Sequence, residues 1–94
     1  MIAKTVIIFV TGFRQDETRV TGMERIWQEA RKFSSEDTWI LSPYRWDECF
    51  REEMAFVARH TALDAKIVIC AYSWGAGNGF RRIAKELDNH GLMV

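Results

Sequence analysis

The chain alternates between two hydrophobic patterns, and this alternation constrains its fold more than any other feature. Three short runs are apolar at nearly every position, as in strands buried on both faces; they are Thr5–Val10, Thr38–Leu41 and Lys66–Ala71. Between and after these runs, apolar residues recur every three or four positions, which is typical of helices with one buried face. Such helices are expected over Gly22 to about Phe33, Glu48 to about Thr61, and Gly75 or Ala76 to Asp88.

Buried strands that alternate with amphipathic helices predict an α/β fold, in which a parallel sheet carries helices on both faces and the crossovers are right-handed. We therefore expect a three-layer sandwich with three parallel strands. The last residues, Leu92-Met93-Val94, resemble the start of a fourth strand, so a truncated parent protein is expected. The chain has no repeat, linker or low-complexity tract, which predicts a single domain over residues 1–94.

Charge and composition exclude several classes of partner. In 94 residues, 13 Lys and Arg balance 13 Asp and Glu, whereas binding to nucleic acid or to an anionic membrane needs clustered positive charge. No run approaches the roughly 18 apolar residues of a membrane helix, and the apolar run near the N-terminus is too short for a signal peptide. We expect a cytoplasmic protein without nucleic-acid or membrane partners.

Neither a metal site nor a cofactor site is predicted. Cys49 and Cys70 lack the spacing of a zinc or redox motif and are expected to be small buried hydrophobic residues. Gly75-x-Gly77-x-Gly79 is a weak match to a dinucleotide-binding loop, because Phe80 follows it and the chain ends before an acidic ribose partner.

The turn after the third predicted strand is the segment that carries chemistry. It reads Ala71-Tyr72-Ser73-Trp74-Gly75-Ala76-Gly77. A serine in a tight turn between strand and helix exposes its hydroxyl, and the sharp bend requires small residues two positions before and after it, as at Ala71 and Gly75. Gly77 would let the helix pack closely on the strand.

This segment resembles the nucleophile elbow of the α/β-hydrolase superfamily, which includes lipases and esterases. Ala71 replaces the first glycine of the motif, as in lipase-like members. An earlier strand of the family ends in His-Gly before a loop that completes the oxyanion hole, and this chain has Thr11-Gly12-Phe13 there. The resemblance implies the strand order second, first, third.

The resemblance also implies a serine hydrolase that acts on an ester or related acyl bond of a small molecule. Ser73 would be the nucleophile, and the backbone N–H groups of Trp74 and Phe13 would hold the oxyanion.

The rest of the catalytic triad is missing. The family's acid and histidine follow the serine, but only Asp88 and His90 do so here, at the far end of the third helix. About 13 helical residues, at about 1.5 Å each, place Asp88 roughly 20 Å from Ser73. His60 is expected at the opposite edge of the sheet. We expect negligible turnover from the chain alone.

Simpler interpretations stay open. Ser73 could be a small polar residue in an ordinary strand-to-helix turn, and Tyr44 to Asp47 could either rim a pocket or form a plain loop in which Asp47 caps the next helix. Arg81 and Arg82 are expected on the solvent face of the third helix.

The alternative function is a non-catalytic module whose exposed third strand pairs with another chain, or a site that another chain completes.

Overall fold

The computed structural model describes residues 2–11, 22–45, 48–71 and 75–94. Its strands are β1 (Ala3–Thr11), β2 (Thr38–Ile40), β3 (Tyr44–Arg45) and β4 (Thr61–Ala71). Its helices are α1 (Gly22–Ala30), α2 (Phe50–Arg59) and α3 (Phe80–Asn89). A 3₁₀ turn, Arg31–Phe33, extends α1, and a π-helical turn, Gly75–Gly79, precedes α3. The predicted alternation of three strands and three helices is confirmed, and the structure adds one short strand, β3, that was not predicted.

The sheet is parallel and β1 lies at its centre. β4 runs along one edge of β1, from the pair Thr5↔Lys66 to the pair Val10↔Ala71. The other edge is shared by β2, which begins opposite Thr5, and β3, which lies opposite Val10 and Thr11. The second predicted strand therefore occupies its expected edge as β2. The short strand β3 follows it on the same edge and was not predicted. Pro43 lies between β2 and β3 and has no N–H to donate to β1.

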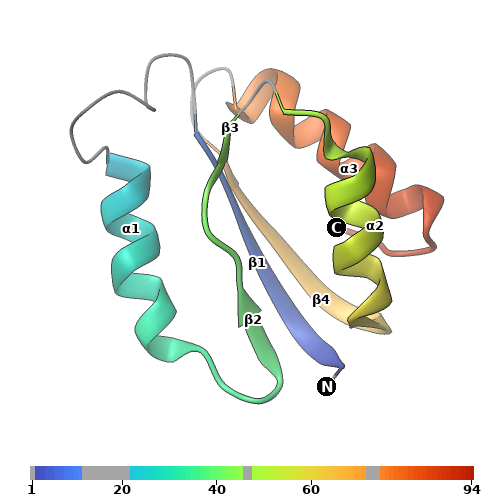
Figure 1. Ribbon diagram of the computed structural model, residues 1–94, viewed down its shortest axis with the longest axis horizontal. Helices are drawn as coiled ribbons and strands as arrows, with labels where there is room; N and C mark the ends of the chain where they lie inside the picture. Colours follow the sequence, from blue (N-terminus) through green and yellow to red (C-terminus); the bar gives the residue numbers. More distant parts are fainter. Residues whose placement is uncertain (1, 12–21, 46–47, 72–74) are drawn as a thin grey trace.

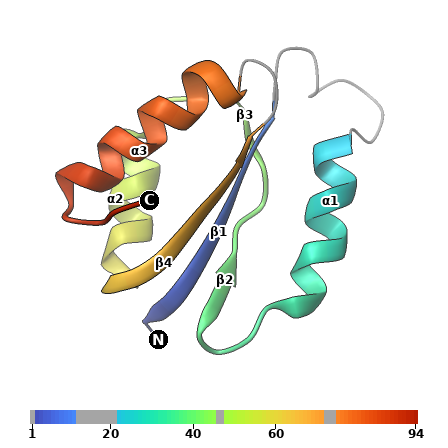
Figure 2. The same cartoon turned by 180° about the vertical axis from the view of Figure 1, so that it is seen from behind.

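The helices cover both faces of the sheet. Figures 1 and 2 show α1 on one side and α2 with α3 on the other. This follows from the strand order, because the chain crosses from β1 to one edge and then passes back over β1 to β4. Two right-handed crossovers in opposite directions leave α1 and α2 on opposite faces.

The core lies mainly between the sheet and the α2 and α3 layer. Most apolar residues at helical spacing on these helices are buried, namely Phe50, Met54, Val57, Ile83 and Leu87, while Ala58, Phe80 and Ala84 are half-buried. They pack with the apolar side chains of β1 and β4. The helical periodicity of both segments thus identified the correct face.

The face predicted for α1 is only partly correct. Ile26 is 54% exposed and Phe33 is 79% exposed, while Trp27 is half-buried. Because α1 covers its side of the sheet without a neighbouring helix, the outer part of its apolar stripe has nothing to pack against. The 3₁₀ turn also changes the angular step between residues, which moves Phe33 off the stripe.

The C-terminal end of α3 confirms the predicted stop but not the predicted fourth strand. Gly91 adopts a φ of 79°, and its N–H donates to Asp88 O at 2.9 Å. The N–H of Leu92 donates to Leu87 O at 3.0 Å, so the helix closes with the Schellman motif that favours glycine. Leu92 is only 1% exposed. It packs on the core after a turn, and residues 92–94 form no strand.

Two element boundaries also differ from expectation. α2 begins at Phe50 with Cys49 as its N-cap, not at Glu48, and Asp47 lies outside the described residues. β4 begins at Thr61, ahead of Lys66, because it includes an irregular segment between its pairs with Ala3 and Thr5. Both cysteines were predicted to be buried; Cys70 is only half-buried and Cys49 is exposed, so the prediction for Cys49 is wrong.

Candidate functional site

The carboxyl edge of the sheet is where the predicted site should lie. β1 ends at Thr11 and β4 ends at Ala71, and the pair Val10↔Ala71 makes the two strand ends direct neighbours. Residues that follow two parallel neighbours leave the sheet at the same edge, which is where open α/β sheets bind ligands. This edge lies at the top of Figure 1.

The predicted site residues themselves, Phe13, Ser73 and Trp74, lie outside the described residues. Their predicted roles therefore stay predictions. The flanking elements are described: β4 ends at Ala71 and the π-helical turn begins at Gly75, so only residues 72–74 connect strand to helix. A connection this short is compatible with a sharp turn, and π-helical turns occur frequently at functional sites.

Gly77 does not have the packing role predicted for it. A Cβ atom built at Gly77 would meet nothing within 4 Å. The turn faces open space there, so no close approach of helix to strand requires glycine at this position.

Thr11 occupies the position where the hydrolase motif often has histidine, and here its role is structural. Its side chain is buried, and its Oγ1 donates a hydrogen bond to Tyr44 O at 3.2 Å. This bond joins the last residue of β1 to β3.

Tyr44 and Arg45 form the short strand β3 beside the end of β1. The Tyr44 ring packs edge-on against Phe50, with 5.9 Å between ring centroids. Burial raises the pKa of Tyr44 to about 12, and the nearby charges of Glu53 and Glu48 and a hydrogen bond to Glu53 add to the effect. The Arg45 N–H donates to Glu48 Oε2 at 2.7 Å, which turns the chain toward α2. The described part of 44–47 is therefore a strand end and not a plain loop, and the pocket-rim interpretation stays a prediction.

Both histidines of the chain lie at the opposite, amino edge. His60 follows α2, and its carbonyl accepts the N–H of Ala3, the first residue of β1, at 2.8 Å. From there β4 runs for 11 residues, or roughly 30 Å at about 3.3 Å per residue, before it reaches Ala71. His90 follows α3 beside Gly91, where an added Cβ would lie 3.9 Å from Leu63 near the start of β4. Neither histidine can serve as a general base at the carboxyl edge.

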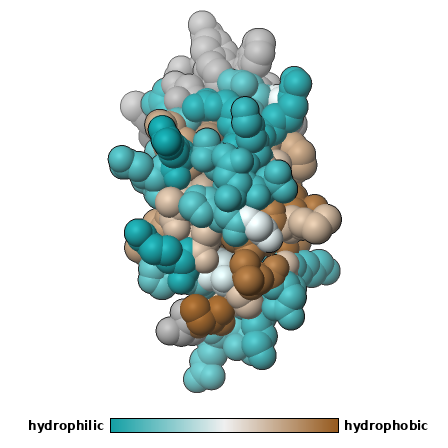
Figure 3. Space-filling view, turned by 90° about the vertical axis from the view of Figure 1, so that its right-hand side faces the viewer, coloured by the Kyte–Doolittle hydropathy of each residue, from teal (hydrophilic) through white to brown (hydrophobic). Residues whose placement is uncertain are grey.

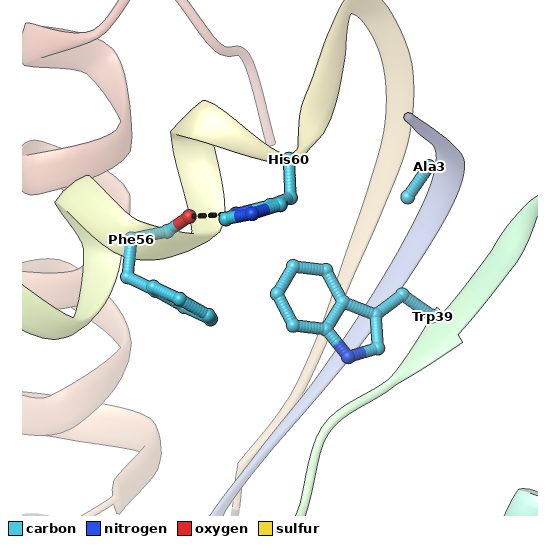
Figure 4. Close-up of a pocket in the computed structure, with 4 residues that line it drawn as sticks. All are labelled: Ala3, Trp39, Phe56 and His60. Atoms are coloured by element: carbon cyan, nitrogen blue, oxygen red, sulfur yellow. Dashed lines mark hydrogen bonds between the residues drawn. The ribbon is translucent and has the colours of Figure 1, made fainter. Parts of the chain in front are cut away.

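An aromatic cavity lies at this amino edge, and the sequence analysis did not predict it. It has a volume of about 170 Å³ and is lined by Ala3, Trp39, Phe56 and His60. Figure 4 shows the three rings around it; Trp39 lies 5.9 Å from Phe56 and 6.0 Å from His60 between centroids. The i, i+4 spacing of Phe56 and His60, which places both on one helix face, is the only sequence signal for it.

His60 lines this cavity as the C-cap residue of α2. Its Nδ1 lies 2.9 Å from Phe56 O. A carbonyl oxygen only accepts, so Nδ1 carries the hydrogen. The imidazole is thus used to satisfy a terminal carbonyl of α2.

A second, more polar cavity separates the start of α2 from α3. Its volume is about 340 Å³, and it is lined by Cys49, Phe50, Arg51, Arg82, Lys85 and Glu86. Arg82 is half-buried there. Its Nη2 donates to Glu48 O at 2.6 Å, and its guanidinium lies 5.1 Å from the Phe50 ring centroid. The expectation that Arg82 faces solvent is therefore wrong, because it reaches across to α2.

The described residues contain no group of three His, Cys, Asp or Glu side chains that could hold a metal ion. Over the same ranges, no helix is long and apolar enough to cross a membrane. Comparison with protein-family models finds no match, and comparisons with curated proteins and with solved structures find none either.

Proposed function

We propose that the chain is a serine hydrolase-like domain, similar to the N-terminal part of an α/β-hydrolase, that acts on an ester or related acyl bond through Ser73. The backbone N–H groups of Trp74 and Phe13 complete the site as oxyanion donors. The substrate is a small molecule with an acyl group.

The pairing of β1 with β4 is the observation that best supports this proposal. The register Val10↔Ala71 means that both connections bearing the three residues depart from adjacent strand ends. The connection after β4 spans only residues 72–74 before the helix begins. A nucleophile elbow and its oxyanion loop need both features.

In this reaction the Ser73 Oγ attacks the acyl carbon while its proton passes to a base. The carbonyl oxygen gains negative charge, which the two N–H groups stabilise. Collapse of the intermediate expels the alcohol and leaves an acyl-enzyme, which water then hydrolyses. Since both histidines lie at the amino edge, neither can act as the base, and we expect the turnover of the chain alone to be negligible.

Labelling with a fluorophosphonate probe tests the proposal, with and without added imidazole as a substitute base. We expect slow labelling of the wild-type chain that imidazole accelerates and that Ser73→Ala abolishes. Ser42→Ala, which alters an exposed serine, is the matched control and should label like wild type. If imidazole produces no labelling above that of Ser73→Ala, the proposed nucleophile is wrong.

A non-catalytic interaction module is the second candidate. In the described part of the chain, β4 pairs with β1 alone, so its other edge is without a strand partner. Such an edge can pair with a strand of another chain, which could also bring the missing acid and histidine. Folded protein that is never labelled, yet associates through β4, would favour this candidate.

A further inference from the structure

The aromatic cavity at the amino edge gathers three rings from two separate elements. Trp39 comes from β2, whereas Phe56 comes from α2 and His60 is the C-cap of that helix. Ala3, which is buried, forms the remaining wall. Figure 4 shows the Phe56 and Trp39 rings on either side of a common space, with the His60 ring beside both. The walls of this cavity are therefore mainly aromatic.

Contacts among the three rings hold these walls in place. Trp39 meets Phe56 at 66° and His60 at 76°, with 5.9 Å and 6.0 Å between centroids, and both contacts have the edge-to-face geometry that aromatic pairs prefer. The Phe56 and His60 rings lie 4.7 Å apart. The hydrogen bond from His60 Nδ1 to Phe56 O fixes the imidazole further. A ligand would meet rings that are already positioned, so its binding costs little side-chain entropy.

Part of the ring surface is left uncovered by the protein itself. Phe56 is 46% exposed, because it lies off the stripe of buried residues with which α2 packs on the sheet. Trp39 is half-buried and His60 is exposed. An apolar ligand in the cavity would remove some of this surface from water, together with its own, which favours binding.

We propose that this cavity binds one uncharged aromatic ring of a small molecule. The cavity has a volume of about 170 Å³, and an apolar protein cavity of about 150 Å³ holds one benzene molecule. A fourth ring can pack against Trp39 and Phe56 with the same edge-to-face geometry that these two rings adopt with each other. The proposal does not depend on the proposed hydrolase activity, because none of the lining residues belongs to that site.

An organic cation fits the cavity less well, although the faces of aromatic rings attract cations. The Arg59 guanidinium already lies 5.9 Å from the Phe56 ring centroid. His60 also gains a positive charge when its imidazole is protonated. Both groups would repel a second cation, whereas neither opposes an uncharged ring.

Titration of the 94-residue protein with benzyl alcohol, followed by amide and ring-proton chemical shifts, tests the proposal. We expect saturable shifts centred on Ala3, Trp39, Phe56 and His60, and nuclear Overhauser effects between the ligand ring and the rings of Trp39 and Phe56. Cyclohexylmethanol, which carries the same substituent on a saturated ring, should bind at least about threefold more weakly.

Two results of this titration would overturn the proposal. Equal binding of both alcohols, or shifts that never saturate, would show only unspecific apolar adsorption. Saturable binding of tetramethylammonium at the same residues, tighter than that of benzyl alcohol, would show that the cavity is a cation site instead.

A pair of matched variants locates the site. Phe56→Leu replaces a ring of the cavity by an aliphatic side chain and should weaken the binding of benzyl alcohol at least about threefold. Phe33→Leu is the control, because Phe33 is 79% exposed and is not among the residues that line the cavity; it should change the affinity by less than about twofold. Amide spectra that match wild type away from each substitution verify the fold. Equal weakening by both variants would contradict a defined site.

Discussion

The two edges of the sheet differ in what they hold. At the carboxyl edge, adjacent ends of β1 and β4 lead into the predicted oxyanion loop and elbow, and Thr11 ties β1 to β3. At the amino edge lie both histidines, each at a helix end, together with the aromatic cavity of Trp39, Phe56 and His60. The side view in Figure 3 places the exposed hydrophobic side chains toward this same end.

The difference shows why possession of the right residue types does not make a catalytic site. A serine and a histidine act together only within hydrogen-bond reach, and here β4 runs its whole length between His60 and Ala71. At the amino edge, polar groups form hydrogen bonds that complete the helix ends. At the carboxyl edge, the strand ends lead into the connections that follow them. Predictions about each edge follow from this division of roles.

The largest expected effect is at the amino edge. Leu92→Ala removes a side chain that is 1% exposed, and truncation of a buried leucine costs about 2–5 kcal/mol of the free energy of unfolding. Met93→Ala is the matched control, because Met93 is 81% exposed and should cost less than about 0.5 kcal/mol. Urea unfolding measures both. Similar costs for the two variants would mean that the C-terminal turn does not pack on the core.

A smaller effect is expected at the carboxyl edge. Thr11→Val keeps the shape of the side chain but loses the hydrogen bond from Oγ1 to Tyr44 O. The loss should lower the free energy of unfolding by about 1 kcal/mol, again by urea titration. The control is Thr5→Val, at a half-buried position of the same strand, which should leave the free energy of unfolding nearly unchanged. A destabilisation by Thr5→Val as large as that by Thr11→Val would rule out a specific tie between β1 and β3.

The smallest effect concerns Tyr44 at high pH. Burial, then the charges of Glu53 and Glu48, raise the pKa of Tyr44 to about 12, above the value near 10 of an unfolded chain. Between these values the unfolded state loses the phenol proton first, so this group lowers stability as pH rises from about 10 to about 12. In Tyr44→Phe the alkaline decline should be shallower. An unchanged slope in thermal unfolding across this range would contradict the assigned environment.

Much of the fold could be predicted from local periodicity, because burial on two faces or on one produces different patterns. The apolar stripes of α2 and α3 identified Phe50, Met54 and Leu87 as core residues, and they are buried. The same reasoning failed for Phe33, in the 3₁₀ turn after α1, since an apolar stripe is buried only where another element covers it. Whether another element packs on the stripe depends on the tertiary structure, which the sequence of a single segment does not encode.

Only some of the predictions about functional residues are tested by the structure. The positions of His60 and His90 at the far edge followed from counting residues along helices, and the structure confirms them. Ser73, Trp74 and Phe13 stay predictions, since they lie outside the described residues. The two cavities were not predicted because each joins side chains from separate elements, such as Arg51 with Lys85, whose proximity depends on how α2 packs against α3.

The most direct test of the account is the rate at which the chain hydrolyses 4-nitrophenyl acetate, measured with and without imidazole after subtraction of the reaction that imidazole catalyses in solution. We expect no turnover by the chain alone, and an imidazole-dependent acylation of Ser73 that Ser73→Ala eliminates. The contradicting result is turnover without imidazole that is lost in Ser73→Ala and also in His60→Ala or in His90→Ala. A histidine of this chain would then be acting on the serine.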